Sequence, residues 1–274
     1  MKTIILITAI VASLNSLAQT EFIGKIVSSN DNQPVAYVNI GIINKDVGTV
    51  SDIYGNFILK ISDKYLNDSI RISSIGFISK VFKVNEILKC NRDTIYLDKA
   101  VYTLSEAVIK PEKYTSKIIG NRFQYGIAGS YGVDQLGNEL GIKVELKGKP
   151  SMLEGFGFYL AENYCDTLFF RVNIYKITDT VPQENILKKN IFIKTATKRG
   201  EVFFDLKKYN LMLEDDFLIS IEWIKNYEKD CIYFRYRPGI FTTPVFLKVA
   251  SQGAWHMERN WGAYFFVSVK QLKQ

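Results

Sequence analysis

The feature that most constrains the fold is a regular succession of short apolar segments and turn clusters between residues 22 and 97. The segment at residues 30–34, Asn-Asp-Asn-Gln-Pro, is typical of a turn, because Asn and Asp tolerate left-handed φ values and Pro fixes φ at about −65°. Similar clusters occur at residues 44–48 and 52–56. Short strands separated by such turns indicate a β-sandwich. We predict seven strands in this block, at residues 22–27, 35–43, 49–51, 57–61, 69–73, 80–84 and 94–97.

Several motifs in this block occur in a recognisable order. They are Ile23-Gly24-Lys25-Ile26-Val27, Gln33-Pro34-Val35-Ala36-Tyr37-Val38-Asn39-Ile40, Gly48-Thr49-Val50-Ser51-Asp52-Ile53-Tyr54-Gly55-Asn56-Phe57, Asp68-Ser69-Ile70-Arg71-Ile72-Ser73-Ser74-Ile75-Gly76-Phe77 and Asp93-Thr94-Ile95-Tyr96-Leu97. This order resembles the carboxypeptidase regulatory-like domain, a transthyretin-like β-sandwich common in exported proteins of Bacteroidetes type. The resemblance covers only the N-terminal part of the chain. It implies an accessory domain without catalytic residues.

Residues 1–18 have the features of a secretory signal peptide. Lys2 supplies a positive charge, residues 4–14 are apolar, and Ser16-Leu17-Ala18 places small residues at the cleavage position. We therefore predict that the mature chain starts at Gln19 and that the protein is exported, to the periplasm or to the outer membrane and cell surface. No later apolar run reaches the roughly 20 residues of a membrane-spanning helix, so no transmembrane helix is expected.

The remainder of the chain predicts a second β-domain. Apolar and polar side chains alternate at residues 166–175, 217–224 and 264–270. This is the pattern of an antiparallel sheet with one face on a core and the other face in water. In the second of these segments the alternation directs the aromatic and aliphatic side chains inward, and it directs Ser220 and Glu222 toward solvent.

We therefore expect an all-β protein with two domains. Residues 19–99 form the transthyretin-like sandwich, residues 100–119 form a linker, and residues 120–274 form a second, jelly-roll-like antiparallel sandwich. The net charge is +7, but basic and acidic residues are nearly balanced, with 10 against 9 in the first domain and 21 against 17 in the second. Because phosphate binding requires a concentrated basic face, nucleic acid is not expected as a partner.

Few residues suited to catalysis are present. The chain has one histidine, His256, whereas a zinc carboxypeptidase needs two histidines and a glutamate on its metal. The same scarcity argues against Ser-His-Asp and Cys-His chemistry, and no cofactor or metal is predicted. A carboxylate-based glycosidase stays open, with Glu154, Glu162, Asp205 and Glu222 as candidates on predicted strands. The alternative is that these carboxylates are charges on solvated strand faces.

The segment at residues 253–262 has the most unusual composition, because it combines two tryptophans with the histidine and an arginine. Indole rings beside hydrogen-bonding groups suit the flat faces of sugar rings. We therefore name Trp255, His256, Arg259 and Trp261 as candidate ligand-binding residues. The alternative is that both tryptophans cap the core of the sandwich.

Four Asp-Ser/Thr-apolar triplets resemble the O-glycosylation motif of exported Bacteroidetes proteins. Their acceptor residues are Ser69, Thr94, Thr167 and Thr180. The alternative is that Asp ends a turn and the next two residues begin a strand.

The three cysteines leave at least one free thiol. Cys165 and Cys231 lie in the same predicted domain. The sequence leaves their pairing open, because a disulfide depends on a distance that only the fold supplies.

These features together predict a non-enzymatic, exported protein of the cell envelope. The first sandwich acts as a spacer or docking module, and the second binds a partner, either an envelope protein or a glycan. One alternative is an outer-membrane component with a small C-terminal β-barrel, related to the N-terminal regions of TonB-dependent receptors. A second alternative is the carboxylate-based glycan hydrolase.

Overall fold

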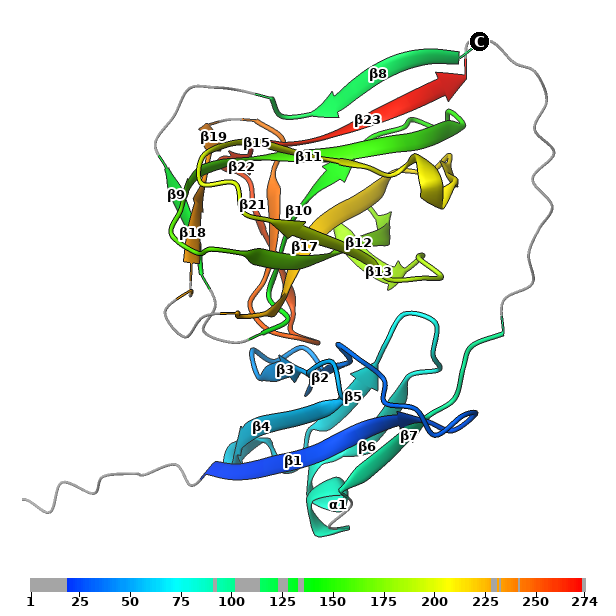
Figure 1. Cartoon of the computed structure of the whole chain (residues 1–274), viewed down its shortest axis with the longest axis vertical. Helices are drawn as coiled ribbons and strands as arrows, with labels where there is room; N and C mark the ends of the chain where they lie inside the picture. Colours follow the sequence, from blue (N-terminus) through cyan, green and yellow to red (C-terminus); the bar gives the residue numbers. More distant parts are fainter. Residues whose placement is uncertain are drawn as a thin grey trace, which may run out of the picture.

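The computed structural model describes residues 19–90, 93–101, 114–122, 128–132, 136–227, 231, 233–240 and 242–272. The predicted leader at residues 1–18 lies outside them. The described chain confirms the predicted all-β class. A small N-terminal domain, blue to cyan in Figure 1, lies against a larger C-terminal domain, green to red.

The N-terminal domain contains the seven strands that the sequence predicts, arranged in two sheets of order β4-β1-β7 and β3-β2-β5-β6. The strands are β1 (Gln19–Ser28), β2 (Asn39–Ile42), β3 (Gly48–Val50), β4 (Asn56–Ser62), β5 (Ser69–Ser73), β6 (Lys80–Lys83) and β7 (Thr94–Leu97). Two short helices, η1 (Asp63–Tyr65) and α1 (Val84–Lys89), are not part of the sequence prediction. Alternation along β5 buries Ile70 and Ile72 in the core and turns Arg71 outward.

The C-terminal domain consists of two seven-stranded antiparallel sheets and a two-stranded ribbon. The first sheet has the order β13-β12-β17-β10-β20-β21, and β14 also pairs with β12. Its strands are β10 (Glu139–Val144), β12 (Leu168–Thr178), β13 (Val181–Asn185), β14 (Ile191–Thr195), β17 (Phe217–Lys225), β20 (Val245–Lys248) and β21 (Trp255–Glu258).

The second sheet has the order β8-β23-β11-β18-β9, and β15 and β16 also pair with β11. Its strands are β8 (Tyr114–Gly120), β9 (Gly129–Gly132), β11 (Ser151–Asn163), β15 (Gly200–Asp205), β16 (Leu211–Leu213), β18 (Tyr233–Tyr236) and β23 (Phe265–Leu272). The ribbon pairs β19 (Pro238–Ile240) with β22 (Trp261–Ala263). The short helix η2 (Lys207–Tyr209) lies between β15 and β16.

The core of the C-terminal domain is formed by the inner faces of its two large sheets. It is rich in aromatic rings that meet edge to face: the ring centroids of Phe158 and Phe170 lie 6.1 Å apart, and those of Phe156 and Phe265 lie 5.5 Å apart. Such pairs add to the free energy gained from apolar burial. The alternating positions of β12 and β17 that were predicted to face inward, including Trp223, are fully buried here.

Two features of the C-terminal domain could not be read from the sequence. Tyr114–Gly120 forms β8 and pairs with β23, so residues 114–119 belong to the second sheet, whereas the sequence predicts that they are part of the linker. Cys165 and Cys231 form a disulfide with their Cα atoms 5.0 Å apart. Cys90, in the N-terminal domain, is free and exposed.

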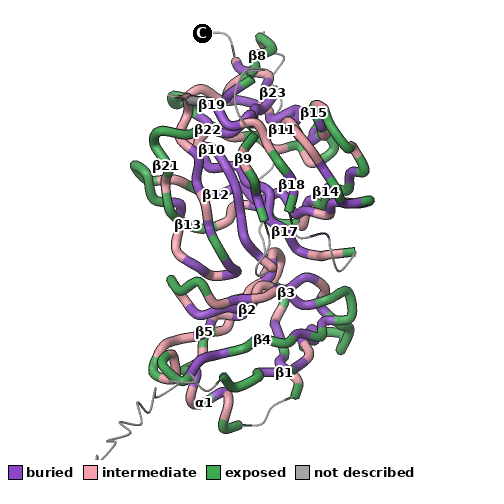
Figure 2. The backbone as a smooth tube through the Cα atoms, turned by 90° about the vertical axis from the view of Figure 1, so that its left-hand side faces the viewer, coloured by how far each residue is buried: buried purple, intermediate pink, exposed green. Residues whose placement is uncertain are grey.

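The two domains meet where β2 and β3 lie directly beneath the C-terminal domain (Figure 2). The turn that follows β20 approaches so closely that a Cβ atom on Gly41 or Gly48 would lie 2.0 or 2.2 Å from the carbonyl oxygen of Ser251. Only glycine allows this approach. Apolar contacts continue the interface, because the ring of Tyr37 packs against that of Phe169 at 5.5 Å.

Candidate functional site

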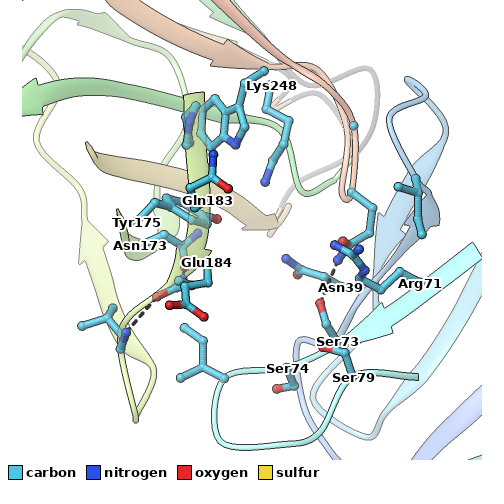
Figure 3. A pocket seen from close by; sticks show the side chains of 18 of the residues that line it. Asn39, Arg71, Ser73, Ser74, Ser79, Asn173, Tyr175, Gln183, Glu184 and Lys248 are labelled. Carbon is cyan, nitrogen blue, oxygen red and sulfur yellow. Dashed lines mark hydrogen bonds between the residues drawn. The ribbon is translucent and has the colours of Figure 1, made fainter. Parts of the chain in front are cut away.

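A cavity of about 390 Å³ lies between the domains and is lined by residues of both. This volume falls within the range typical of small-molecule sites, roughly 300–1,000 Å³. Most of its lining residues carry polar side chains, and Figure 3 shows them on two facing walls. They include Asn39, Arg71, Ser73, Ser74 and Ser79 from the N-terminal domain, and Asn173, Tyr175, Gln183, Glu184 and Lys248 from the C-terminal domain.

The C-terminal wall is the outer face of the first large sheet. Because side chains alternate along a strand, the residues between the core positions of β10, β12, β17 and β20 all point to this face. The strand register then brings their polar members together across neighbouring strands. The cross-strand partners are Arg171 and Glu222, Asn173 and Ser220, Glu139 and Glu222, and Glu139 and Lys248.

Glu222 is the first of two buried carboxylates behind this wall. The Nε and Nη2 atoms of Arg171 both lie 2.8 Å from Glu222 Oε2, and Asn173 Nδ2 donates to the same oxygen at 2.6 Å. Burial raises the pKa of Glu222, and the Arg171 guanidinium opposes that rise. Glu222 Oε1 has no hydrogen-bond partner within the described part of the chain.

Glu139 is the second buried carboxylate. It accepts hydrogen bonds from Tyr175 Oη at 2.8 Å and from Ser220 Oγ at 2.6 Å, and it forms an ion pair with Lys248. Burial, followed by the negative charge of Glu139, raises the pKa of Tyr175 well above its usual range. Tyr175 therefore stays a neutral hydrogen-bond donor at physiological pH.

Arg171 connects this network to the N-terminal domain. Its Nη1 donates to the backbone oxygen of Tyr37 at 2.8 Å, and its Nη2 donates to Asn39 Oδ1. The side chain is almost fully buried, with 2% of its surface exposed. One guanidinium therefore holds both the carboxylate behind the C-terminal wall and the start of β2, so the network also sets the position of the opposite wall.

The structure separates the four candidate residues of the tryptophan segment. Trp255, at the start of β21, is half-buried and lines the cavity. Its ring meets that of Tyr175 edge to face at 5.5 Å, and Lys248 Nζ lies 4.8 Å from its centroid. His256, Arg259 and Trp261 are exposed and do not line the cavity.

The four candidate carboxylates also separate. Glu154 pairs with Lys270 at 3.2 Å on β11 and β23. Glu162 pairs with Arg235, and Asp205 accepts a hydrogen bond from the amide of Lys207 at 2.8 Å.

Glu222 alone of these four contacts residues of the cavity wall, through Arg171 and Asn173. The expectation that Ser220 and Glu222 face solvent is wrong, because both are 0% exposed. The physical reason is that the N-terminal domain and neighbouring side chains cover the outer face of this sheet. One signal in the sequence could have indicated that this face is covered. Leu218 and Ile224 lie on the same face of the strand as Ser220 and Glu222, and a face in water would not need these apolar residues.

Residues 22–109 match the family model of the CarboxypepD_reg-like domain. The N-terminal domain is therefore a CarboxypepD_reg-like domain, as the motif order predicts. The match ends at residue 109, before the C-terminal domain, which carries the other wall of the cavity. No curated protein matches the chain.

Within the ranges given above, no helix is long and apolar enough to cross a membrane. In the same ranges, no three His, Cys, Asp or Glu side chains gather in a way that could hold a metal ion.

Proposed function

We propose that this is a non-enzymatic binding protein of the cell envelope and that the cavity between its domains takes a glycan. The observation that carries the proposal is the composition of the cavity. The indole of Trp255 offers an apolar surface, while Asn39, Asn173 and Gln183 offer amide donors and acceptors. Sugar rings need both, because their C–H faces stack on aromatic rings and their hydroxyls exchange hydrogen bonds.

The N-terminal domain has a larger role in this proposal than that of a spacer. It supplies one wall of the cavity, and the Arg171 network holds that wall in register with the C-terminal sheet. Pre-organised walls reduce the entropy that a ligand loses on binding. The glycan is thus bound by the two-domain unit and not by either domain alone.

Export is part of the proposal. The leader-like residues 1–18 support it, as does the disulfide between Cys165 and Cys231, since disulfides persist in oxidising compartments. Fractionation of native cells with protease treatment of intact cells tests this. Cleavage on intact cells, or release with the periplasmic fraction, is expected, and recovery in the cytosol would contradict export.

Among the acceptor residues of the four O-glycosylation motifs, Thr180 is the most accessible, and we propose it as the modified one. Thr180 is exposed in the turn between β12 and β13. Ser69 and Thr94 are half-buried at the starts of β5 and β7, and Thr167 is half-buried directly before β12. Mass spectrometry of the native protein should find a glycan on Thr180. A modification confined to the other three would contradict this assignment.

The binding proposal is tested with Trp255→Ala on a broad glycan panel. We expect a glycan that binds the wild type and binds the variant about tenfold more weakly, because a stacking surface worth about 1.4 kcal/mol is lost. Trp261→Ala is the matched control, since it removes an exposed tryptophan outside the cavity. Equal losses in the two variants, or no glycan bound by the wild type, would contradict the proposal. Thermal unfolding shows that each variant is folded.

A further inference from the structure

The charges that line the cavity do not cancel. Four charged residues contribute to it: Arg71, Arg171, Lys248 and Glu184. Arg171 is neutralised by Glu222 and Lys248 by Glu139, both on the buried side of the wall. Glu184 is largely exposed, and its Oε1 lies 3.8 Å from Nζ of Lys176 on the neighbouring strand β12.

Arg71 is therefore the cation of the cavity that lacks a counter-charge. It has no ion pair with any residue that the structure describes. It is half-buried on β5, where its strand neighbours Ile70 and Ile72 face the core. Figure 3 places Arg71 on the same wall as Ser73, Ser74 and Ser79. A guanidinium is a planar fork of N–H donors, and a carboxylate matches that fork with two parallel hydrogen bonds.

A buried hydroxyl on the same wall also lacks a partner. Ser74 is 8% exposed, and its Oγ has no hydrogen-bond partner among the residues described. Ser73 Oγ accepts a hydrogen bond from Gln252 Nε2 at 2.7 Å, which leaves its own proton to donate. Buried polar groups in proteins are nearly always paired, so an unpaired hydroxyl in a cavity wall indicates a group that the cavity is built to receive.

We propose that the glycan bound in this cavity carries a carboxylate, as in a uronic acid, and that Arg71 binds this carboxylate with help from the hydroxyls of Ser73 and Ser74. The sugar ring then lies toward Trp255 on the C-terminal wall. This inference rests on the proposed function, and it adds the chemical class of the ligand. A single uncompensated guanidinium suits a singly charged carboxylate.

The test compares acidic oligosaccharides, such as oligogalacturonates, with their methyl esters, which keep the ring and lose the charge. Titration calorimetry on the two-domain chain should show the acid bound at least about tenfold more tightly than the ester. Arg71→Gln should remove that preference. Arg259→Gln is the matched control, because it removes the same charge from an exposed position outside the cavity, and it should leave the preference unchanged.

The outcomes separate the inference from the function on which it rests. Suppose that acid and ester bind equally, that Arg71→Gln has no effect, and that Trp255→Ala weakens binding. This result would overturn the inference that the glycan carries a carboxylate, but it would support the glycan site itself. Tighter binding of sulfated or phosphorylated glycans than of uronates would also overturn it. Absence of any Trp255-dependent binding would remove the proposed function itself. The ester comparison needs no variant, so it stays decisive even if Arg71→Gln unfolds.

Discussion

The two domains place oppositely charged side chains in contrasting settings. In the N-terminal domain, Glu21 and Lys60 face each other across β1 and β4 at 3.8 Å, with 51% and 64% of their side chains exposed. In the C-terminal domain, Arg171 and Glu222 pair at 2.8 Å with 2% and 0% exposed. An exposed pair contributes roughly 0–1 kcal/mol to stability, whereas removing one partner of a buried pair costs about 3–5 kcal/mol.

The difference does not come from the strands themselves. Lys60 and Glu222 both occupy outward positions between core residues of an alternating strand. The outer face of β1 and β4 stays open, since Ile23 and Ile58 there are 55% and 56% exposed. The outer face of β12 and β17 is covered in part by the start of β2 from the other domain. Contact between domains therefore turns an ordinary polar strand face into a buried network.

The largest expected effect comes from Arg171→Ala. It leaves the Glu222 carboxylate buried without its cation and removes the hydrogen bonds to Tyr37 and Asn39. We expect a loss of about 3–5 kcal/mol in the free energy of unfolding, measured by urea denaturation.

Lys60→Ala is the matched control for this comparison, because it breaks an exposed pair, and we expect it to cost less than about 1 kcal/mol. If the two variants lost similar amounts of unfolding free energy, burial at the domain interface would not make the Arg171 pair more important to stability than the Lys60 pair. The double variant Arg171→Met with Glu222→Leu should recover part of the loss, because no buried charge is then left unpaired.

The disulfide gives the next effect in size. Cys165 and Cys231 are 66 residues apart in sequence, so their bond limits the unfolded chain by closing a long loop. Replacing both with serine should lower the free energy of unfolding by about 2–4 kcal/mol. Cys90→Ser, in the N-terminal domain, should change it by less than about 0.5 kcal/mol, because this thiol is exposed and unbonded. Urea denaturation measures both variants, and a urea midpoint that does not change when the disulfide is removed would contradict the prediction.

The smallest effect depends on pH and concerns Asp216, which lies between the two extremes of exposure. Desolvation raises its pKa, but hydrogen bonds from the amides of Lys147 and Leu146 and the charge of Lys143 outweigh it and hold the pKa below its ordinary value of 3.8. A folded-state pKa that is lowered adds stability above pH 3.8 and loses it as the pH falls through the folded value.

Asp216→Asn should therefore destabilise the protein by up to about 1 kcal/mol at pH 7 and by less at low pH. Urea midpoints at several pH values measure the difference in stability between wild type and variant, which should become smaller as the pH falls. Asp215→Asn, at the exposed neighbouring position, serves as the control. A gap that widens on acidification would show that Asp216 does not gain stability from its charge.

Much of the fold was predictable, but little of the candidate site was. The seven N-terminal strands and the alternating strands around Phe170 and Ile219 follow from local patterns, and the structure confirms them. Of the four predicted ligand-binding residues, only Trp255 lines the cavity. The residues that form the rest of it, such as Arg71 and Asn173, lie on different domains, and no spacing in the sequence relates them.

The sequence by itself determined where strands and turns occur, which side chains face the two cores, and that the N-terminal domain is CarboxypepD_reg-like. These properties depend on side-chain alternation and turn residues, which act over a few positions. Only the tertiary structure decided that Cys165 meets Cys231, that β8 joins β23, and that Glu222 is buried. Each of these depends on what another part of the chain places beside a residue, and the alternation within a strand is the same whether its outer face meets water or a second domain.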